Sequence, residues 1–210
     1  MPVHLPQPLR TLQQLDAWPW SGLQSSHRAL RIATEAHHQQ LRKDGSPFLL
    51  HPLGVWQNLV QVELADPHVL GLALVHDVLE ERPLEAAYFE QRIAHELGSD
   101  AARHVRWLSD KADRSTERRK QDQLRKLRHA PWPVRVVKLA DRLANLQSGP
   151  APGWSAAKAR TYAEHSLALL DVLGPAHVEL AFYIRRTLAQ AAWLGGTPMD
   201  HASKSGAENA

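Results

Sequence analysis

Helix-breaking signals recur along this chain at intervals that suit helices. Gly98, Gly174-Pro175 and Gly195-Gly196 each end a stretch with apolar residues at helical spacing. Asp66-Pro67 pairs a helix-capping residue with a proline at the first helical position. No stretch alternates apolar and polar residues as a half-buried strand would. The sequence therefore predicts an all-α fold.

Nine stretches meet these helical criteria. Their expected bounds are about 26–42, 52–62, 67–82, 84–97, 100–109, 117–128, a segment around 136–143, 155–173 and a last helix ending near 194. At 210 residues with 43% hydrophobic residues, the chain suits one domain with a sizeable core. We expect this domain at 25–195, with an N-terminal extension at 1–24 and a small, polar, disordered tail at 196–210.

Composition excludes several functional classes. The chain has no cysteine, which excludes disulfides, thiolate metal ligands and a cysteine nucleophile. No apolar run is long enough to span a membrane, and no signal-peptide core precedes the domain, so a cytoplasmic protein is expected. The formal net charge of +3 suits an anionic small ligand but is too small and dispersed to predict a nucleic-acid polymer as partner. The sequence carries no signal for an oligomeric state.

His76-Asp77 lies late in a strongly apolar helical stretch, where an unpaired charge would be costly. Glu80 follows His76 by four residues, and Glu81 follows Asp77 by four. One helix face would therefore gather an imidazole and three carboxylates. Such a patch could bind a metal and deprotonate a water. With 13 histidines in the chain, the alternative is a chance pair at an exposed helix end.

Three further positions extend this patch. His51 precedes Pro52 at the expected start of a helix, and Asp141 and Asn145 lie four residues apart after an apolar helical stripe. Two imidazoles (His51, His76) and two carboxylates (Asp77, Asp141) would suit manganese, iron or zinc better than calcium. The alternatives are a helix cap or a surface residue for His51, and an ion pair with Arg142 or Lys138 for Asp141. Spacing alone does not show that the four converge.

Three ordered segments carry a family resemblance: 42–52 (RKDGSPFLLHP), 76–81 (HDVLEE) and 137–145 (VKLADRLAN). Together they resemble the hydrolase domain of the RelA/SpoT family, within the HD superfamily of metal-dependent phosphohydrolases. The resemblance covers about 25–190, and no synthetase domain follows. Trp154-Ser155 and Tyr162 also look like the single-domain small alarmone hydrolases, including metazoan SpoT homologues. The resemblance implies an HD-type bundle of about eight to ten helices.

The resemblance also implies residue roles. The metal, usually Mn²⁺, would be held by His51, His76, Asp77 and Asp141. Glu80, with Glu81 beside it, would be the catalytic residue that works with the metal-bound water. The substrate-binding positions implied or suggested by this region are Arg42, Lys43, Asn145, Lys138 and Lys111. The implied reaction is hydrolysis of (p)ppGpp at the 3′ phosphorus, which yields GDP or GTP and pyrophosphate.

Three residues depart from the family pattern. The acidic pair is usually Glu-Asp, but here it is Glu80-Glu81, and Arg82 stands where threonine is common. Ala144 replaces a frequent histidine or tyrosine. These changes leave two alternatives open. One is a related HD phosphohydrolase acting on adenosine alarmones, NADPH or nucleoside monophosphates. The other is a degenerate module that binds a nucleotide without turnover.

Two weaker features complete the sequence-based expectations. A basic segment around 114–128 is expected to be a solvated helix, with Arg118 and Arg119 as alternative phosphate contacts. His37 and His38 are expected to be surface or structural residues.

Overall fold

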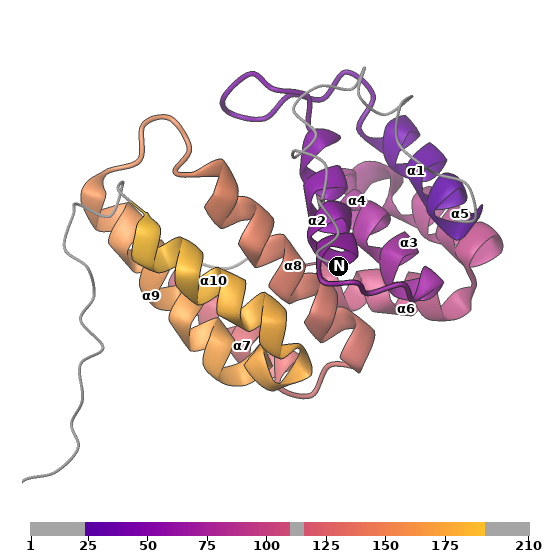
Figure 1. Ribbon diagram of the computed structural model, residues 1–210. Coiled ribbons are helices and arrows are strands. Elements are labelled where there is room, and N and C mark those ends of the chain that lie inside the picture. The colour runs from indigo at the N-terminus through magenta and orange to yellow at the C-terminus, as the bar shows by residue number, and fades with distance from the viewer. Residues whose placement is uncertain (1–23, 110–115, 192–210) are drawn as a thin grey trace, which may run out of the picture.

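The computed structural model describes residues 24–109 and 116–191, and these fold into ten α-helices and two short 3-10 helices (Figure 1). The helices are α1 (Gln24–Ala36), α2 (Leu50–Gln61), α3 (Pro67–Val75), α4 (Val78–Glu81), η2 (Pro83–Glu85), α5 (Ala86–Leu97), α6 (Ser99–Leu108), α7 (Thr116–Leu127), α8 (Trp132–Ser148), α9 (Ala156–Leu173), η3 (Gly174–Ala176) and α10 (Val178–Gln190). An isolated bridge between Leu41 and Pro47 is the only β pairing in the described part. The all-α prediction is confirmed.

Helix α3 forms the centre of the first half of the molecule. Every residue from Val69 to Val75 is buried, and the helix packs against α1, α2, α5, α6 and α8. A helix that is apolar on all sides is stable only when surrounded in this way. Asp66 caps it as predicted, since its side chain accepts hydrogen bonds from the backbone N–H groups of His68 and Val69. This rigid helix delivers His76 to the interior.

Helix α8 joins the two halves of the fold. It packs against α2, α3 and α6 on one side and against α9 and α10 on the other, with α7 packed on α9 (Figure 1). Its interior positions from Val136 to Ala144 include Asp141 and Arg142, which are 5% and 6% exposed. A carboxylate and a guanidinium therefore lie in the core, where each needs a polar partner.

Two predicted helices differ from the structure. The first ends at Ala36 rather than near Arg42, because the chain turns through residues 37–39 and Gln39 adopts a left-handed φ of 56°. The stretch predicted as one helix over 67–82 is broken at His76 and Asp77 into α3 and α4. The imidazole Nδ1 of His76 lies 2.7 Å from the carbonyl oxygen of Ala73 and takes an acceptor that would otherwise continue the helix.

Several helix ends agree with the signals in the sequence. Ser155 caps α9 by accepting from the N–H of Lys158, and Gly98 ends α5 with a φ of 98°. The expected extension, the tail, the last residues of the final helix and Lys111 lie outside the described residues, apart from Gln24. Within the described ranges no helix has the length and apolar character needed to cross a bilayer.

Candidate metal centre

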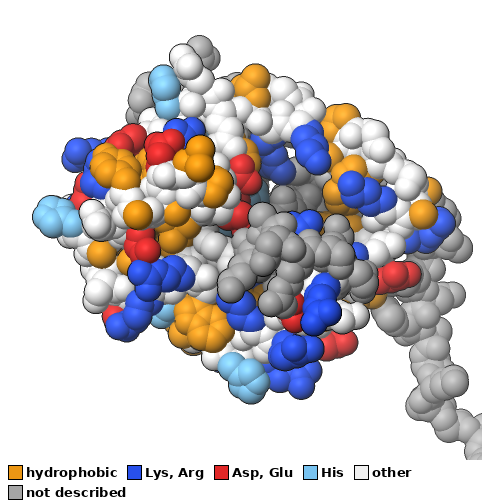
Figure 2. All heavy atoms as spheres, turned by 180° about the vertical axis from the view of Figure 1, so that it is seen from behind, with side chains coloured by type: hydrophobic (Ala, Val, Ile, Leu, Met, Phe, Trp, Pro, Cys, Tyr) orange, Lys and Arg blue, Asp and Glu red, His pale blue; other side chains and the backbone are white. Residues whose placement is uncertain are grey.

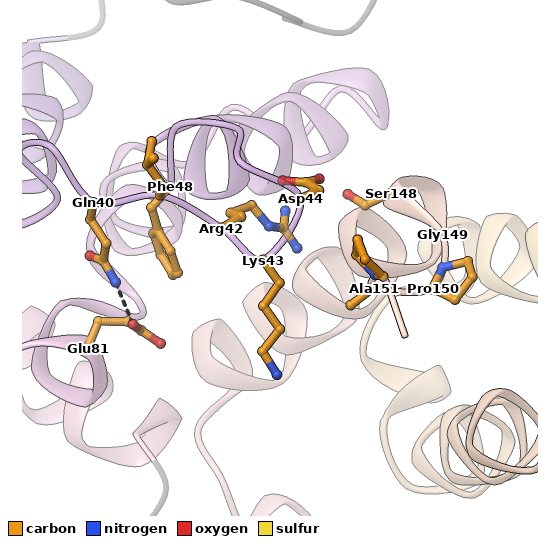
Figure 3. A pocket seen from close by; sticks show the side chains of 12 residues that line it. Gln40, Arg42, Lys43, Asp44, Phe48, Glu81, Ser148, Gly149, Pro150 and Ala151 are labelled. Atoms are coloured by element: carbon orange, nitrogen blue, oxygen red, sulfur yellow. Dashed lines mark hydrogen bonds between the residues drawn. The ribbon is translucent and has the colours of Figure 1, made fainter. Parts of the chain in front are cut away.

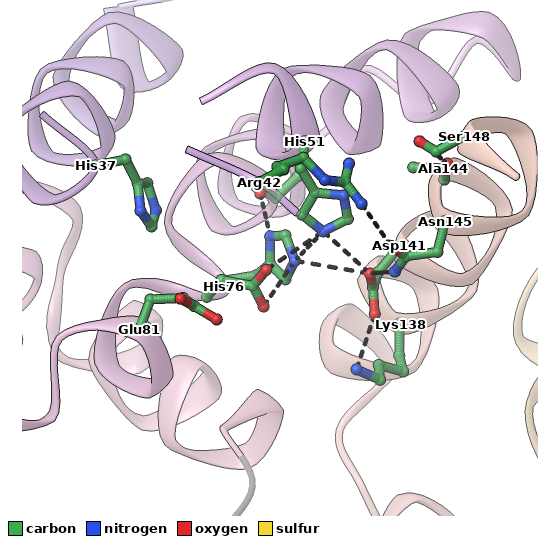
Figure 4. A network of polar contacts seen from close by, with 12 residues as sticks. His37, Arg42, His51, His76, Glu81, Lys138, Asp141, Ala144, Asn145 and Ser148 are labelled. Atoms are coloured by element: carbon green, nitrogen blue, oxygen red, sulfur yellow. Dashed lines mark hydrogen bonds and ion pairs between the residues drawn. The ribbon is translucent and has the colours of Figure 1, made fainter. Parts of the chain in front are cut away.

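Four predicted ligands from three separate parts of the chain meet in one place (Figure 4). His51 lies in the first turn of α2, His76 and Asp77 form the break between α3 and α4, and Asp141 lies in the middle of α8. His51, His76 and Asp141 are almost fully buried, and the Asp77 side chain is 21% exposed. The helix packing α2·α3·α8 therefore brings these residues together.

The donor atoms of these four residues face one another at short distances. The Nε2 atom of His51 lies 3.3 Å from Asp77 Oδ2, 3.2 Å from Asp141 Oδ1 and 3.3 Å from the Nε2 atom of His76. The Nε2 atom of His76 lies 3.0 Å from Asp77 Oδ1 and 3.9 Å from Asp141 Oδ1. Two nitrogens and two carboxylates thus surround a single point.

These separations fit a metal ion. Nitrogen and oxygen ligands bind at about 2.0–2.2 Å, so neighbouring ligands of one ion lie roughly 3.0–3.5 Å apart. His51, His76 and Asp77 alone form a group whose ligand atoms all lie within 4.8 Å of one another. Asp141 adds a fourth donor to this possible metal site.

The hydrogen bond of His76 also suits metal binding. A backbone carbonyl only accepts, so His76 Nδ1 must be the donor to Ala73 O. In the neutral imidazole this leaves the Nε2 lone pair facing the cluster, which is the arrangement that a metal-ligating histidine requires. The other nitrogen of His51, Nδ1, is buried without a hydrogen-bond partner among the described residues.

The charges and hydrogen bonds within the cluster shift the pKa values of its members. Burial opposes ionisation of His51, but the hydrogen bonds and charges of Asp141 and Asp77 prevail and raise its pKa to about 9. Burial likewise opposes ionisation of the carboxyls. Even so, the charge of His76 and the hydrogen bond of His51 hold the pKa of Asp77 well below its usual range. The pKa of Asp141 is also lowered against burial, first by the charge of Lys138. Both carboxylates are therefore anionic and ready to bind a cation.

Asp141 is held by two more side chains on α8. The Nζ atom of Lys138 lies 2.8 Å from Asp141 Oδ2, and Asn145 Nδ2 donates to Asp141 Oδ1 at 2.6 Å. Arg42 in turn donates to Asn145 Oδ1 at 3.4 Å. Lys138 and Asn145, both predicted to bind substrate, thus contact a candidate metal ligand in this structure.

The two glutamates of the acidic pair have different surroundings. Glu80 is exposed although His76, four residues earlier, is buried, because the helix breaks between them and they do not share one continuous face. Glu81 lies on the flank of the cluster opposite Lys138 and Asn145 (Figure 4). Its Oε2 atom accepts a hydrogen bond from Gln40 Nε2 at 2.6 Å. Glu80 and Glu81 are both exposed, so burial does not distinguish them, and their place in one compact patch stays a prediction.

A pocket of about 340 Å³ (Figure 3) is linked to the cluster through Arg42, which lines the pocket and donates to Asn145, the hydrogen-bond partner of Asp141. Arg42 and Lys43 line it together with Gln40, Phe48 and Glu81, and the opposite wall is Ser148, the last residue of α8, with the loop 149–152. Gly45 permits the turn that presents Arg42 and Lys43, since it has a φ of 84° and donates to Arg42 O. The sequence had not marked the 148–152 wall, because a Ser-Gly-Pro loop after a helix has no chemical signature of its own.

Two interior residues near the site lie outside the predicted set of site residues, and one of them, His37, was expected to be a surface or structural residue. His37 is 4% exposed, stacks on Phe48 and has a pKa lowered by burial. The signal for its burial is helical spacing, since it follows Ala33 by four residues. Arg142 donates to Ser166 Oγ at 3.1 Å and lies over the Tyr162 ring at 4.4 Å, so it fastens α9 to the helix that carries Asp141.

The basic segment forms α7, as predicted, and Lys126 Nζ donates to the carbonyl of Ser109. Arg118 is exposed, whereas Arg119 and Lys120 are partly buried. Figure 2 shows Lys and Arg side chains in several separate groups on one face, interspersed with acidic and apolar ones.

Comparisons with known proteins identify the family of this chain. A family model described as HD domain matches residues 29–175. Two relatives named guanosine-3′,5′-bis(diphosphate) 3′-pyrophosphohydrolase MESH1 come from Danio rerio and Homo sapiens. Each is 32% identical, over 141 and 142 residues that cover 64% and 65% of this chain and 76% and 77% of the relative. A solved structure described by the words "A metazoan ortholog of SpoT hydrolyzes ppGpp and plays a role in starvation responses" matches with a TM-score of 0.71 and 26% identity, and covers 81% of this chain and 97% of that chain. This chain belongs to the HD domain family, in the group that contains these small hydrolases.

Proposed function

We propose that this protein is a metal-dependent hydrolase that cleaves (p)ppGpp at the 3′ phosphorus, giving GDP or GTP and pyrophosphate. The observation that carries the proposal is the meeting of two imidazoles and two carboxylates beside a pocket lined by Arg42 and Lys43. A metal-competent cluster near cationic side chains suits a substrate with several phosphate groups. The names of the MESH1 relatives support the same reaction.

We assign the metal to His51, His76, Asp77 and Asp141, and we propose Mn²⁺ because a mixed nitrogen and oxygen set suits it. When bound, the ion would lower the pKa of a coordinated water and neutralise charge that develops on the phosphorus oxygens. Lys138 balances part of the negative charge of Asp141, so the ligand remains an anion in the interior.

The neighbouring side chains have distinct proposed roles. Glu81, on the flank of the cluster, would orient the attacking water and accept its proton. Glu80, which is exposed like Glu81 and which the family resemblance assigns to the catalytic water, would share this role. Arg42 and Lys43 would bind the guanine nucleotide in the pocket. Asn145 spans Arg42 and Asp141 through its two amide atoms, which links the nucleotide pocket to the metal centre.

The direct test is pyrophosphate release from ppGpp by the full chain, with and without Mn²⁺. Wild type is compared with Asp77→Ala and with the matched control Asp171→Ala, which removes an exposed carboxylate on α9 far along the chain from the cluster. We expect Mn²⁺-dependent turnover in wild type and control, and at least a 100-fold loss in Asp77→Ala, since a metal ligand is removed. Equal rates in the two variants would refute the metal assignment.

The same assay distinguishes the alternatives. Turnover of an adenosine alarmone or NADPH, with none of ppGpp, would replace the substrate and keep the metal centre. Binding of ppGpp without turnover at saturating Mn²⁺ would indicate a degenerate module instead. In that case Glu81→Asp, which restores the usual acidic pair, is expected to raise activity. The cytoplasmic location stays a prediction from composition.

A further inference from the structure

A buried histidine that no proposed catalytic step uses lies beside the metal centre. His37 is 4% exposed and stacks on Phe48, with ring centroids 4.6 Å apart and planes 27° apart. Phe48 also contacts the ring of His51 edge-on, with centroids 6.1 Å apart. Figure 4 shows His37 and Glu81 together on the flank of the cluster opposite Lys138 and Asn145. The position of His37 is therefore fixed relative to the centre.

A chain of hydrogen bonds runs from His37 to Glu81. His37 Nδ1 lies 2.8 Å from Gln40 Oε1, and Gln40 Nε2 donates to Glu81 Oε2 at 2.6 Å. A carboxylate only accepts, so the amide of Gln40 must face Glu81 with its NH₂ group. The amide oxygen then faces His37, and His37 Nδ1 must be the donor. The Glu81 carboxylate at one end of this hydrogen-bond chain thus fixes the tautomer of His37 at the other end.

The backbone holds the middle of this chain in place. The turn after α1, with Gln39 at a φ of 56°, returns Gln40 toward the core, and Gln40 N donates to His37 O at 3.1 Å. The carbonyl oxygen of Gln40 accepts from Phe48 N at 2.9 Å. Glu81 lacks such restraint, since it is exposed at the end of the four-residue helix α4. A glutamate there has several side-chain rotamers, and ordering it costs conformational entropy.

We propose that His37 is a positioning residue, which orients the Gln40 amide so that the amide holds the Glu81 carboxylate against the metal centre. This inference rests on the proposed function, in which Glu81 serves the attacking water. Catalytic carboxylates need their geometry held to within a fraction of an ångström, since a displacement on the order of 1 Å can cost about 100-fold in rate. His37 acts through Gln40 and does not touch the substrate.

Kinetics on two variants of His37 tests the role. His37→Phe keeps an aromatic ring against Phe48 but removes the donor, whereas His37→Asn keeps a donor near the place of Nδ1. We expect His37→Phe to lower kcat for ppGpp about tenfold, with KM changed less than about twofold, because a group acting in the transition state is misplaced. His37→Asn should recover most of kcat. A loss that appears in KM alone, or equal losses in both variants, would overturn the proposal.

Measuring His37→Phe in the Glu81→Ala variant distinguishes the positioning of Glu81 from general structural damage. In Glu81→Ala there is no carboxylate to position, so adding His37→Phe should lower kcat no further. The same tenfold loss with and without Glu81 would show that His37 acts on something else. Thermal unfolding of each variant verifies that the proteins compared are folded.

A measurement without substrate keeps this test independent of the proposed reaction. In ¹⁵N-histidine NMR of metal-free protein, the His37 resonances are those that disappear in His37→Phe. We expect the proton on Nδ1 in wild type and a loss of this preference in Glu81→Ala, where the amide of Gln40 is free to turn. A proton on Nε2 in wild type would overturn the inference. Absence of ppGpp turnover in wild type would refute the proposed function, and the NMR result would still decide the hydrogen-bond chain.

Discussion

The stability of this protein should fall between pH 7 and pH 4.5 partly because of one histidine in α9. His165 Nδ1 lies 3.2 Å from the guanidinium of Arg142, and a guanidinium only donates, so the imidazole is an acceptor here. Burial first, and then the charges of Arg142 and Lys120, lower the pKa of His165 to about 4. Replacing it by asparagine (His165→Asn) keeps an acceptor for Arg142 but removes the titrating group.

The magnitude follows from the difference between the two states. The unfolded chain binds a proton at His165 below the ordinary pKa of 6.5, whereas the folded protein resists it down to about 4. The contribution is therefore complete above pH 6.5 and is lost progressively as pH falls toward 4. The full shift corresponds to about 3 kcal/mol. His165 is only partly buried, so solvent screening reduces the expected contribution to about 1–2 kcal/mol.

Urea unfolding at pH 7 and at pH 4.5, in metal-free buffer, measures this contribution. Wild type should lose about 1–2 kcal/mol more than His165→Asn between the two pH values. The pKa values of His37, His104 and His177 are also lowered by burial, but these residues are present in both proteins and cancel in the comparison. Equal losses in the two proteins would refute the assignment of a depressed pKa to His165.

Three further substitutions test other parts of the structure. Asp66→Ala removes two cap hydrogen bonds from α3 and should lower the free energy of unfolding by about 1 kcal/mol, seen as a lower urea midpoint with an unchanged m-value. Lys138→Met leaves the buried Asp141 carboxylate without its ammonium partner. The free energy of unfolding of the metal-free protein should fall by about 3 kcal/mol, which is near the low end for a broken buried ion pair because Asn145 and His51 remain as partners of Asp141. A decrease below about 1 kcal/mol in urea unfolding would contradict this electrostatic account. Arg42→Ala should raise KM for ppGpp roughly 10–100-fold with a smaller change in kcat, since it removes a charged contact in the nucleotide pocket; a loss in kcat alone, in steady-state kinetics, would place Arg42 in the chemical step instead.

Most of the helices could be predicted from the sequence because their signals are local. The Asp66-Pro67 start, the Ser155 cap and the Gly98 stop act within one helical turn, and the structure confirms each of them. The errors occur where a side chain competes with the helix. His76 Nδ1 donates to the carbonyl oxygen of Ala73, and α3 ends there. The apolar spacing of this stretch predicts one continuous helix instead.

The all-α class, most helix boundaries and the residue types available for a metal site follow from local spacing and composition, so they can be predicted from the sequence. Which of those residues meet depends on how the helices pack. The packing of α2, α3 and α8 brings His51, His76 and Asp141 together, from positions 25 and 65 residues apart in the chain. The break at His76 separates Glu80 and Glu81 from α3, and the turn after Ala36 places His37 in the interior. Distance along the chain does not encode distance in space, so convergence of donors and the hydrogen-bond chain to Glu81 could arise only from long-range packing.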